Sequence, residues 1–394
     1  MINENLKTEV KYKTEVLIAG GGFAGISAAL SAAREGANVM LLEREYILGG
    51  LGTAGLITIY LPLCDGKGKQ VSFGIAEELL RLSISMGAEA NSYPTAWLGG
   101  GTEEERCENR FLARFNPQLF AILAEQLLIS EGVKILYGTS VCAAECKSGR
   151  IKHLIAENKS GRFAIEAKSV VDCTGDADIC KFSGEDSRLF EQGNPLAAWH
   201  YAFDGKEVKL VLLGASDIPD EDKTGDEPAP LINHRFAGID GEELSDMVVL
   251  SHKETLDYVK QMKKDNEEHV PATITTIPQI RMTRCIDGVS VMDTKDDHKR
   301  VSDSVGLISN WKKRGPIYEV PFSALYGYKI KNLITAGRCI SATDPMWDVT
   351  RVIPCCAVTG EAAGLAAAVC DDFPSIDVTI IQEKLLSRGV VLHI

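Results

Sequence analysis

The sequence predicts an α/β fold built on a parallel β-sheet, and three segments near its start support this prediction. Val16–Ala19 is a short apolar run that leads into a glycine-rich turn, as a buried parallel strand does. Ile26–Glu35 is rich in Ala and is followed by Gly36, a pattern typical of a helix and its end. Val39–Leu42 is a second apolar run, so strand, helix and strand alternate as they do in α/β proteins.

The turn between the first strand and the helix has the spacing of a dinucleotide-binding loop. Gly20, Gly22 and Gly25 fit the pattern G-x-G-x-x-G. In such a loop the first Gly allows a sharp turn, the second lets a pyrophosphate approach the backbone, and the third lets the helix pack closely. The helix N-terminus offers free N–H groups to the phosphates. We therefore predict a bound dinucleotide, and a structural glycine-rich turn without a ligand is the alternative.

An acidic residue ends the second predicted strand where a ribose would lie. Glu43 follows Gly22 by about 20 residues, the distance at which a carboxylate accepts hydrogen bonds from ribose hydroxyls. The same carboxylate would repel a 2′-phosphate, so bound NADP is disfavoured.

Composition and charge argue against several other classes of protein. Asp and Glu number 55 against 42 Lys and Arg, and this net charge of −13 argues against a nucleic-acid binder. The 11 Cys include no C-x-x-C and the seven His no H-E-x-x-H, so we expect neither a disulfide framework nor a protein-bound metal. The N-terminal residues are polar, and no apolar run approaches the ~20 residues of a membrane span. We therefore expect a cytoplasmic protein with no membrane partner.

A second glycine-rich stretch, Leu48–Gly55, closely follows Glu43 and Arg44. Here the chain resembles the flavoprotein superfamily that includes fumarate reductase and glutathione reductase, in which such a loop passes along the pyrophosphate and the flavin. The chain also resembles a bacterial family of FAD-dependent oxidoreductases. The resemblance implies FAD rather than NAD as the cofactor. The matching segments are Glu15–Gly55, Phe115–Asp178, Ile280–Ile286 and Tyr318–Ala368.

The resemblance implies a three-layer FAD/NAD(P)-binding (Rossmann-like) domain with a β-meander and an inserted α+β cap. The residues predict a helix from Asn116-Pro117 to Ser130 and a strand at Val133–Tyr137. The meander is expected at Ser140–Cys146, Ile151–Asn158 and Arg162–Ala167, where turns separate the runs.

Two further segments would close over the cofactor. Ser169–Asp176 predicts a strand and a tight turn that resembles an Ala-Thr-Gly motif, with Cys173 in place of Ala. Asn332–Gly337 resembles the last flavin-associated strand, but Arg338 stands where many superfamily members carry an Asp that binds the ribityl chain. By the same resemblance, the small-residue helix that begins at Pro354 would point its positive end at the flavin. A simple packing helix is the alternative.

The cofactor-binding residues implied by these motifs are spread over most of the chain. They are Gly20, Gly22, Phe23, Ala24, Gly25, Glu43, Arg44, Gly49, Gly50, Gly52, Thr53, Val141, Cys173, Thr174, Gly175, Asp176, Gly337, Arg338, Val352 and Pro354. Val141 is included because a backbone group near this position meets the adenine in the superfamily.

The flavin-binding domain is expected to be discontinuous, with an insertion and a cap or substrate domain between its parts. The domain comprises residues 1–60, 110–185 and 320–394, and the remaining segments are 61–109 and 186–319. The insertion is expected to hold a helix near Phe73–Ser85. The cap is expected to include an exposed acidic loop at Asp217–Glu227.

Three arginines and a histidine are candidates for catalysis. Arg281 and Arg284 match an Arg-rich segment of the family. If this segment is a strand, Arg281 and Thr283 share one face and Arg284 lies on the other, so at most one Arg would clamp a carboxylate substrate. A surface or interdomain salt bridge is the alternative. Arg351 would add positive charge beside the flavin, and His200 is a candidate general acid or base.

Asp348 is a second candidate for general acid or base. Cys355 and Cys356 stand at the start of the helix that would face the flavin. A vicinal disulfide that exchanges electrons with the flavin is one interpretation, since helix N-termini lower thiol pKa values, but we favour buried packing.

Together these features predict an FAD-dependent oxidoreductase that transfers a hydride between a small organic substrate and flavin N5. No second G-x-G-x-x-G lies between a strand and a helix, so we expect electrons from the substrate itself, a docking nicotinamide or a protein partner. An NAD-dependent dehydrogenase and a non-catalytic flavin-binding protein are the alternatives.

Overall fold

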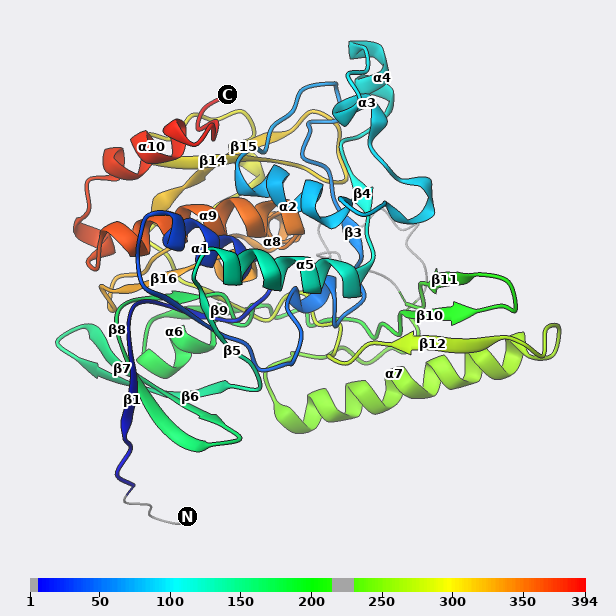
Figure 1. Cartoon of the computed structure of the whole chain (residues 1–394), viewed down its shortest axis with the longest axis horizontal. Helices are drawn as coiled ribbons and strands as arrows, with labels where there is room; N and C mark the ends of the chain where they lie inside the picture. The colour runs from blue at the N-terminus through cyan, green and yellow to red at the C-terminus, as the bar shows by residue number, and fades with distance from the viewer. Residues whose placement is uncertain (1–5, 215–229) are drawn as a thin grey trace.

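A seven-stranded sheet forms the centre of the computed structural model, which describes residues 6–214 and 230–394 (Figure 1). The strand order is β5-β2-β1-β8-β7-β6, and β16 also pairs with β8. The strands are β1 (Val10–Ala19), β2 (Val39–Leu42), β5 (Lys134–Leu136), β6 (Ser140–Lys147), β7 (Arg150–Asn158), β8 (Gly161–Asp172) and β16 (Leu333–Thr335). This arrangement confirms the predicted parallel sheet and meander, whereas the predicted acidic loop lies outside the described residues.

The long strand β8 connects the parallel part of the sheet with the meander. It runs parallel to β1 along its length, its first part is antiparallel to β7, and its last residues are parallel to β16. We expected two separate strands here. The structure joins them because no Gly or Pro interrupts the chain at Ala167, Lys168 and Ser169.

Both faces of β1 are buried, which explains its unbroken apolar run. Val16 and Ile18 face a core that contains the main helices, and Leu17 and Ala19 face a second core beneath the meander. All four side chains are at most 1% exposed. Continuous burial of this kind is typical of parallel sheets covered on both faces.

Two helices pack closely on one face of the sheet, α1 (Phe23–Arg34) and α9 (Ile353–Val369). A Cβ atom at Gly364 would lie only 2.0 Å from the carbonyl oxygen of Ala28, and Gly360 is similarly crowded by α1. Small residues are therefore required where the two helices cross, as the sequence predicts.

The helix layer also contains α2 (Ile75–Ser83), which lies within the segment predicted as an insertion. It contacts α5 (Pro117–Ser130) and α9 (Figure 1). From the segment predicted as the cap, β14 (Ser304–Ser309) contacts α9 as well. Parts of both segments thus share the helix layer, and the proposed domain boundaries stay a prediction.

A second part of the predicted cap forms an arm that extends from the body of the molecule (Figure 1). Its three-stranded sheet has the order β11-β10-β12, and α7 (Gly241–Met262) lies beside it. The strands are β10 (His200–Phe203), β11 (Val208–Val211) and β12 (Val270–Ile274).

The remaining elements are short and connect these parts. They are α3 (Thr95–Leu98), α4 (Glu103–Glu108), α6 (Asp178–Ser183), α8 (Asp344–Thr350), α10 (Val378–Ser387), β3 (Ile59–Tyr60), β4 (Ala113–Arg114), β9 (Ser187–Leu189), β13 (Arg284–Ile286) and β15 (Ile317–Pro321). Within the described ranges no single helix is long and apolar enough to cross a membrane; α8 and α9 meet that test only as a pair bent by 85°.

Candidate functional site

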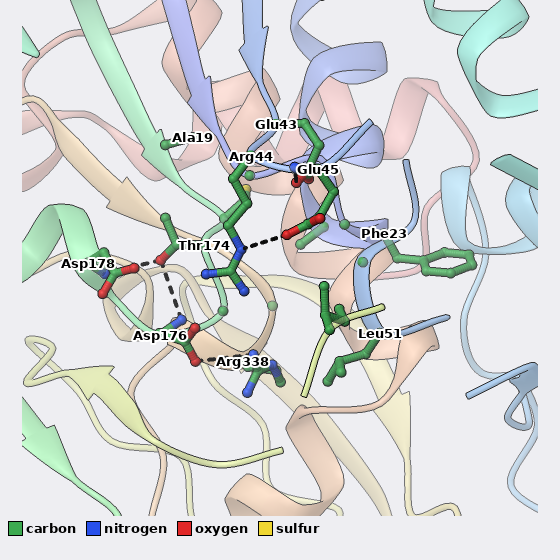
Figure 2. A pocket seen from close by; sticks show the side chains of 18 of the residues that line it. Ala19, Phe23, Glu43, Arg44, Glu45, Leu51, Thr174, Asp176, Asp178 and Arg338 are labelled. Atoms are coloured by element: carbon green, nitrogen blue, oxygen red, sulfur yellow. Dashed lines mark hydrogen bonds and ion pairs between the residues drawn. The ribbon is translucent and has the colours of Figure 1, made fainter. Parts of the chain in front are cut away.

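A cavity of about 1450 Å³, its open mouth included, lies at the carboxyl ends of β1, β2, β8 and β16. Ligands of open parallel sheets bind at this edge. Figure 2 shows side chains from the strand ends and from the loop after β2 around the cavity. Gly20, Gly49, Gly175 and Gly337 all line it, so four glycine-rich segments far apart in sequence meet here.

The turn between β1 and α1 leaves one of its glycines open toward the cavity. Gly20 has φ +103°, and a Cβ there would lie 2.3 Å from the carbonyl oxygen of Cys173. At Gly25 a Cβ would lie 1.9 Å from the carbonyl oxygen of Gly20. At Gly22 a Cβ would meet nothing within 4 Å. Gly20 and Gly25 are therefore required by packing, whereas Gly22 keeps space clear beside the N-terminus of α1.

Glu43 ends β2 and is held at the cavity by the backbone. Its Oε2 accepts a hydrogen bond from Gly21 N at 2.7 Å, and its Oε1 accepts one from Glu45 N at 2.8 Å. The residue is buried, and burial raises the pKa of its carboxyl, against the effect of the two backbone hydrogen bonds. Figure 2 shows Glu43, Arg44 and Glu45 together at the cavity.

The second glycine-rich loop lies directly against the first. Gly49 N donates to Gly21 O at 2.8 Å, and Gly49 has φ +100°. Thr53 does not line the cavity; its hydroxyl donates to Leu48 O and so closes the loop. Gly52 packs against the ring of Phe23, where a Cβ would lie 2.4 Å from a ring carbon.

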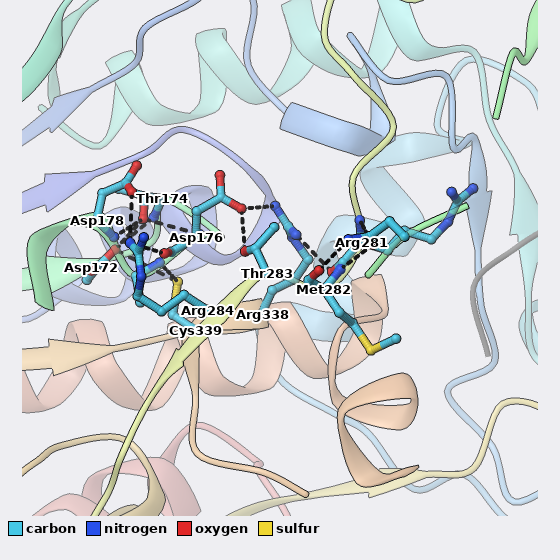
Figure 3. A network of polar contacts seen from close by, with 12 residues as sticks. Asp172, Thr174, Asp176, Asp178, Arg281, Met282, Thr283, Arg284, Arg338 and Cys339 are labelled. Atoms are coloured by element: carbon cyan, nitrogen blue, oxygen red, sulfur yellow. Dashed lines mark hydrogen bonds and ion pairs between the residues drawn. The ribbon is translucent and has the colours of Figure 1, made fainter. Parts of the chain in front are cut away.

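The turn after β8 supports Arg338 (Figure 3). A Cβ at Gly175, which has φ +82°, would lie 2.5 Å from the guanidinium of Arg338. That guanidinium donates to Asp176 Oδ1 at 3.2 Å and to Arg281 O at 2.8 Å. Arg338 thus bridges the end of β8 and the inserted segment, beside the cavity that it also lines.

Three carboxylates gather beneath this turn (Figure 3). Asp172 is fully buried, and its Oδ1 accepts a hydrogen bond from Thr174 Oγ1 at 2.7 Å. Asp178 lines the cavity and lies 3.3 Å from Arg284 Nη1. Burial, together with the negative charges of Asp176 and Asp172, raises the pKa of Asp178 to about 6. Asp178 therefore changes charge near neutral pH.

The Arg-rich segment is not a strand, because β13 begins only at Arg284. Figure 3 shows Arg284 directed toward the carboxylates and Arg281 directed away from them. Thr283 Oγ1 donates to Asp176 Oδ1 at 2.8 Å, so Thr283 shares its side with Arg284 and not with Arg281. The guanidinium of Arg281 lies 5.0 Å from the ring centroid of Trp199. Neither Arg lines the cavity.

The side chain of Asn194 explains the irregular backbone in this segment. Its Oδ1 accepts hydrogen bonds from the backbone N–H groups of Arg281 and Met282, both at 3.0 Å. A side chain thus takes the place that a neighbouring strand would occupy, and the alternation expected of a strand does not apply.

Arg351 is the one predicted catalytic residue that lines the cavity. It lies between α8 and α9, and Ile353 and Cys356 from the first turn of α9 line the same end. Val352 and Pro354 are buried and do not line the cavity. The N-terminus of α9 therefore faces the cavity, but the residues that line it are sequence neighbours of Val352 and Pro354, the two that we predicted.

The paired cysteines have different surroundings. Cys355 lies in the helix core, whereas Cys356 lines the cavity. Both are free thiols, and burial raises the pKa of Cys356 to about 12. The buried Cys355 agrees with the packing role we favoured, whereas Cys356 is only half-buried.

His200 lies in the arm and away from the cavity. It is fully buried in β10, its Nδ1 is 3.2 Å from Ala198 O, and its ring packs edge-on to Tyr258 of α7 with 5.6 Å between centroids. Burial lowers the pKa of His200. Its position gives no support to the predicted role in acid–base chemistry.

Sixteen of the predicted cofactor-binding residues line the cavity. Gly25, Thr53, Val352 and Pro354 do not. Sequence reasoning missed further lining residues, some of them in the inserted segment and the others in the segments predicted as the flavin-binding domain. These are Leu51, Gly238, Leu244, Ile277, Pro278, Ile280, Ile353 and Cys356, together with Ala19, Leu42, Glu45, Thr139, Ser140, Asp178 and Ala336. Thr139 and Ser140 immediately precede Val141 and would have been found by extending that segment.

In the part of the chain that the structure describes, no group of three or more His, Cys, Asp or Glu side chains is arranged to hold a metal ion.

The sequence model of a family described as FAD dependent oxidoreductase matches residues 15–198 and 198–385. A thioredoxin reductase from Ureaplasma parvum serovar 3 is 30% identical over 76 residues, which are 19% of this chain and 25% of that protein. The match thus spans about a quarter of that relative's length.

Two solved structures are similar to this chain at low sequence identity. A geranylgeranyl bacteriochlorophyll reductase-like protein from Thermoplasma acidophilum has a TM-score of 0.50 and 14% identity, over 96% of this chain and 84% of that chain. The p-nitrophenol 4-monooxygenase PnpA from Pseudomonas putida DLL-E4 has a TM-score of 0.44 and 14% identity, over 96% and 84%.

Proposed function

The chain belongs to the FAD dependent oxidoreductase family, and on that premise we propose that it transfers a hydride between a small organic substrate and N5 of FAD held in the cavity. FAD is its cofactor, and the family assignment favours FAD over the NAD alternative. The proposal depends above all on one observation. The two glycine-rich loops, the turn after β8 and the N-terminus of α9 line a single continuous cavity.

The residues present fit an extended dinucleotide. Space is open at Gly22, where an added Cβ would meet nothing within 4 Å, so phosphates can approach the N-terminus of α1. Glu43 keeps acceptor capacity for ribose hydroxyls beyond its two backbone hydrogen bonds. Val141 lines the cavity two residues after Thr139, whose N–H donates to Glu43 O at 3.0 Å, in keeping with an adenine near Glu43.

When bound, FAD supplies flavin N5, the atom that accepts or donates the hydride. Arg351 and the N-terminus of α9 offer positive charge to the cavity. Leu244, Ile277 and Ile280 from the inserted segment line the cavity with apolar side chains. Since Arg281 and Arg284 do not line the cavity, Arg351 is the better candidate to hold a carboxylate on the substrate.

The purified protein is expected to bind FAD and to absorb near ~450 nm, as the oxidised cofactor does. Anaerobic mixing with a panel of carboxylates, alcohols and amines should bleach this band for at least one class. Arg351→Met should retain FAD but slow the bleaching. A colourless protein that does not take up added FAD would refute the cofactor site. A yellow protein that no substrate or reductant bleaches would instead favour a non-catalytic flavoprotein.

The affinity for FAD is expected to increase as the pH falls through 6. Asp178 has its pKa raised to about 6, so it is anionic above that pH and neutral below it. The pyrophosphate of FAD is negative, and removal of one nearby charge should lower the dissociation constant about tenfold between pH 8 and pH 5. Fluorescence titration with FAD at both values measures this. Asp178→Asn should bind tightly at both, and an unchanged pH dependence in that variant would contradict the prediction.

A further inference from the structure

Arg351 reaches the cavity from a network of ion pairs that lies outside it. We propose that Asp348 is a positioning residue, which together with Lys312 holds the guanidinium of Arg351 at the end of α9 and so raises the reduction potential of the flavin. This inference rests on the proposed function, since it requires the flavin to lie beside Arg351.

Asp348 contacts two cations with its two carboxylate oxygens. Its Oδ1 accepts a hydrogen bond from Arg351 Nε at 3.0 Å, and Nη2 of the same Arg also pairs with it. Its Oδ2 pairs with Lys312 Nζ. The Asp348 side chain is 2% exposed and the Arg351 side chain 9%, so the pair is largely shielded from water. A buried carboxylate engaged in this way fixes a guanidinium, and it is poorly placed to donate or accept a proton in catalysis.

The backbone supports the same geometry. Asp348 and Arg351 lie one helical turn apart at the end of α8, and Arg351 N donates to Trp347 O at 3.0 Å. The indole Nε1 of Trp311 donates to Asp348 O at 3.0 Å. Trp311 and Lys312 lie in the turn between β14 and β15, so this hairpin is joined to α8 at the point where α9 begins.

The hairpin turn is itself held in place. Arg110 Nη2 donates to Asn310 O at 2.8 Å, and its Nη1 donates to Trp311 O. The ring of Trp311 lies 4.8 Å from Lys312 Nζ and 6.0 Å from Arg351 Cζ, within the range of a cation–π contact. Lys312 therefore reaches Asp348 from a constrained position rather than from a free loop.

The charge balance explains why this position matters for the flavin. A hydride carries two electrons and one proton, so the flavin gains one negative charge when no second proton follows. Arg351 and the N-terminus of the 17-residue α9 both favour negative charge at this end of the cavity. Asp348 does not line the cavity, so its contact with the flavin site runs through Arg351.

The test is the two-electron reduction potential of the FAD-loaded protein, measured against a reference dye. Arg351→Met, and Asp348→Asn combined with Lys312→Met, should each lower the reduced-to-oxidised ratio at a fixed potential about tenfold, which corresponds to about 30 mV for a two-electron couple. Adding Arg351→Met to that pair should lower the ratio no further than Arg351→Met alone does, because the pair acts through the position of Arg351. Asp344→Asn is the matched control: Asp344 lies on the same helix and pairs with Arg188, away from the cavity, and its loss should leave the potential unchanged.

Asp348→Asn alone would remove a negative charge and so raise the potential directly. Asp348→Asn combined with Lys312→Met keeps the net charge of the cluster but leaves Arg351 without its anchor, so this pair isolates the positioning effect. Circular dichroism and the FAD content establish that each variant is folded and loaded. If Arg351→Met shifts the potential but Asp348→Asn combined with Lys312→Met does not, the positioning role is refuted and the proposed function stands. If Arg351→Met itself has no effect, the flavin does not lie beside Arg351, and the orientation assumed in the proposed function fails with it.

Discussion

Gly22→Val is expected to weaken FAD binding about 100-fold or more, equivalent to about 3 kcal/mol, without unfolding the protein. Gly22 precedes α1 with φ −70°, a conformation that Val adopts without strain, and an added Cβ would meet no protein atom within 4 Å. The new side chain would therefore occupy the space that the pyrophosphate needs and little else. Fluorescence titration with FAD and thermal unfolding of the apoprotein measure the two quantities separately.

Gly241→Val is a suitable control, because a Cβ added at Gly241 would likewise meet no atom within 4 Å, yet this residue lies at the start of α7, outside the cavity lining. It should retain the wild-type affinity for FAD. If Gly22→Val also retains that affinity, the cofactor does not pass over the β1–α1 turn, and the proposed site is wrong.

Glu361→Gln is expected to stabilise the protein at pH 8 relative to the wild type by about 3 kcal/mol more than at pH 4.5. Glu361 lies in α9, is 3% exposed, and accepts a hydrogen bond from Ile75 N at 2.8 Å at the start of α2. Burial raises the pKa of its carboxyl from 4.5 to about 7, although the hydrogen bond from Ile75 opposes this. The folded state therefore holds the proton more tightly than the unfolded state does.

The sign of the effect follows from this difference. Below pH 4.5 the carboxyl is protonated in both states, and between pH 4.5 and about 7 only the folded state keeps the proton, so the wild type loses stability as the pH rises. Gln mimics the protonated form and does not contribute to this loss. Urea unfolding of the apoprotein at pH 4.5 and pH 8 measures this difference in stability. Glu383→Gln, on the exposed side of α10, is the control. A pH dependence that Glu361→Gln leaves unchanged would show that Glu361 is not the group responsible.

Much of the nucleotide-binding half could be predicted because its signals are local. The run Val39–Leu42 matches β2 residue for residue, and the helix expected from Asn116-Pro117 to Ser130 matches α5. The start of β1 was predicted too late, at Val16 instead of Val10. Its first residues alternate with charged ones and are exposed, and they become a strand only by pairing with β8.

The catalytic candidates were less predictable because their positions depend on distant partners. Arg281 and Arg284 are directed by Asn194 and by the carboxylates after β8, and His200 is enclosed by α7. No short sequence motif indicates these contacts.

Spacing along the chain was therefore sufficient to identify the glycine turns and the acid at Glu43, because each of those features depends on backbone geometry over a few neighbouring residues. Packing between segments far apart in the sequence determines which arginine side chains reach the cavity. Arg351 lines it and Arg281 does not, although both are arginines in matching family segments. The position of a long side chain depends on the residues that surround it in space. Those residues come from elements that no local sequence pattern connects.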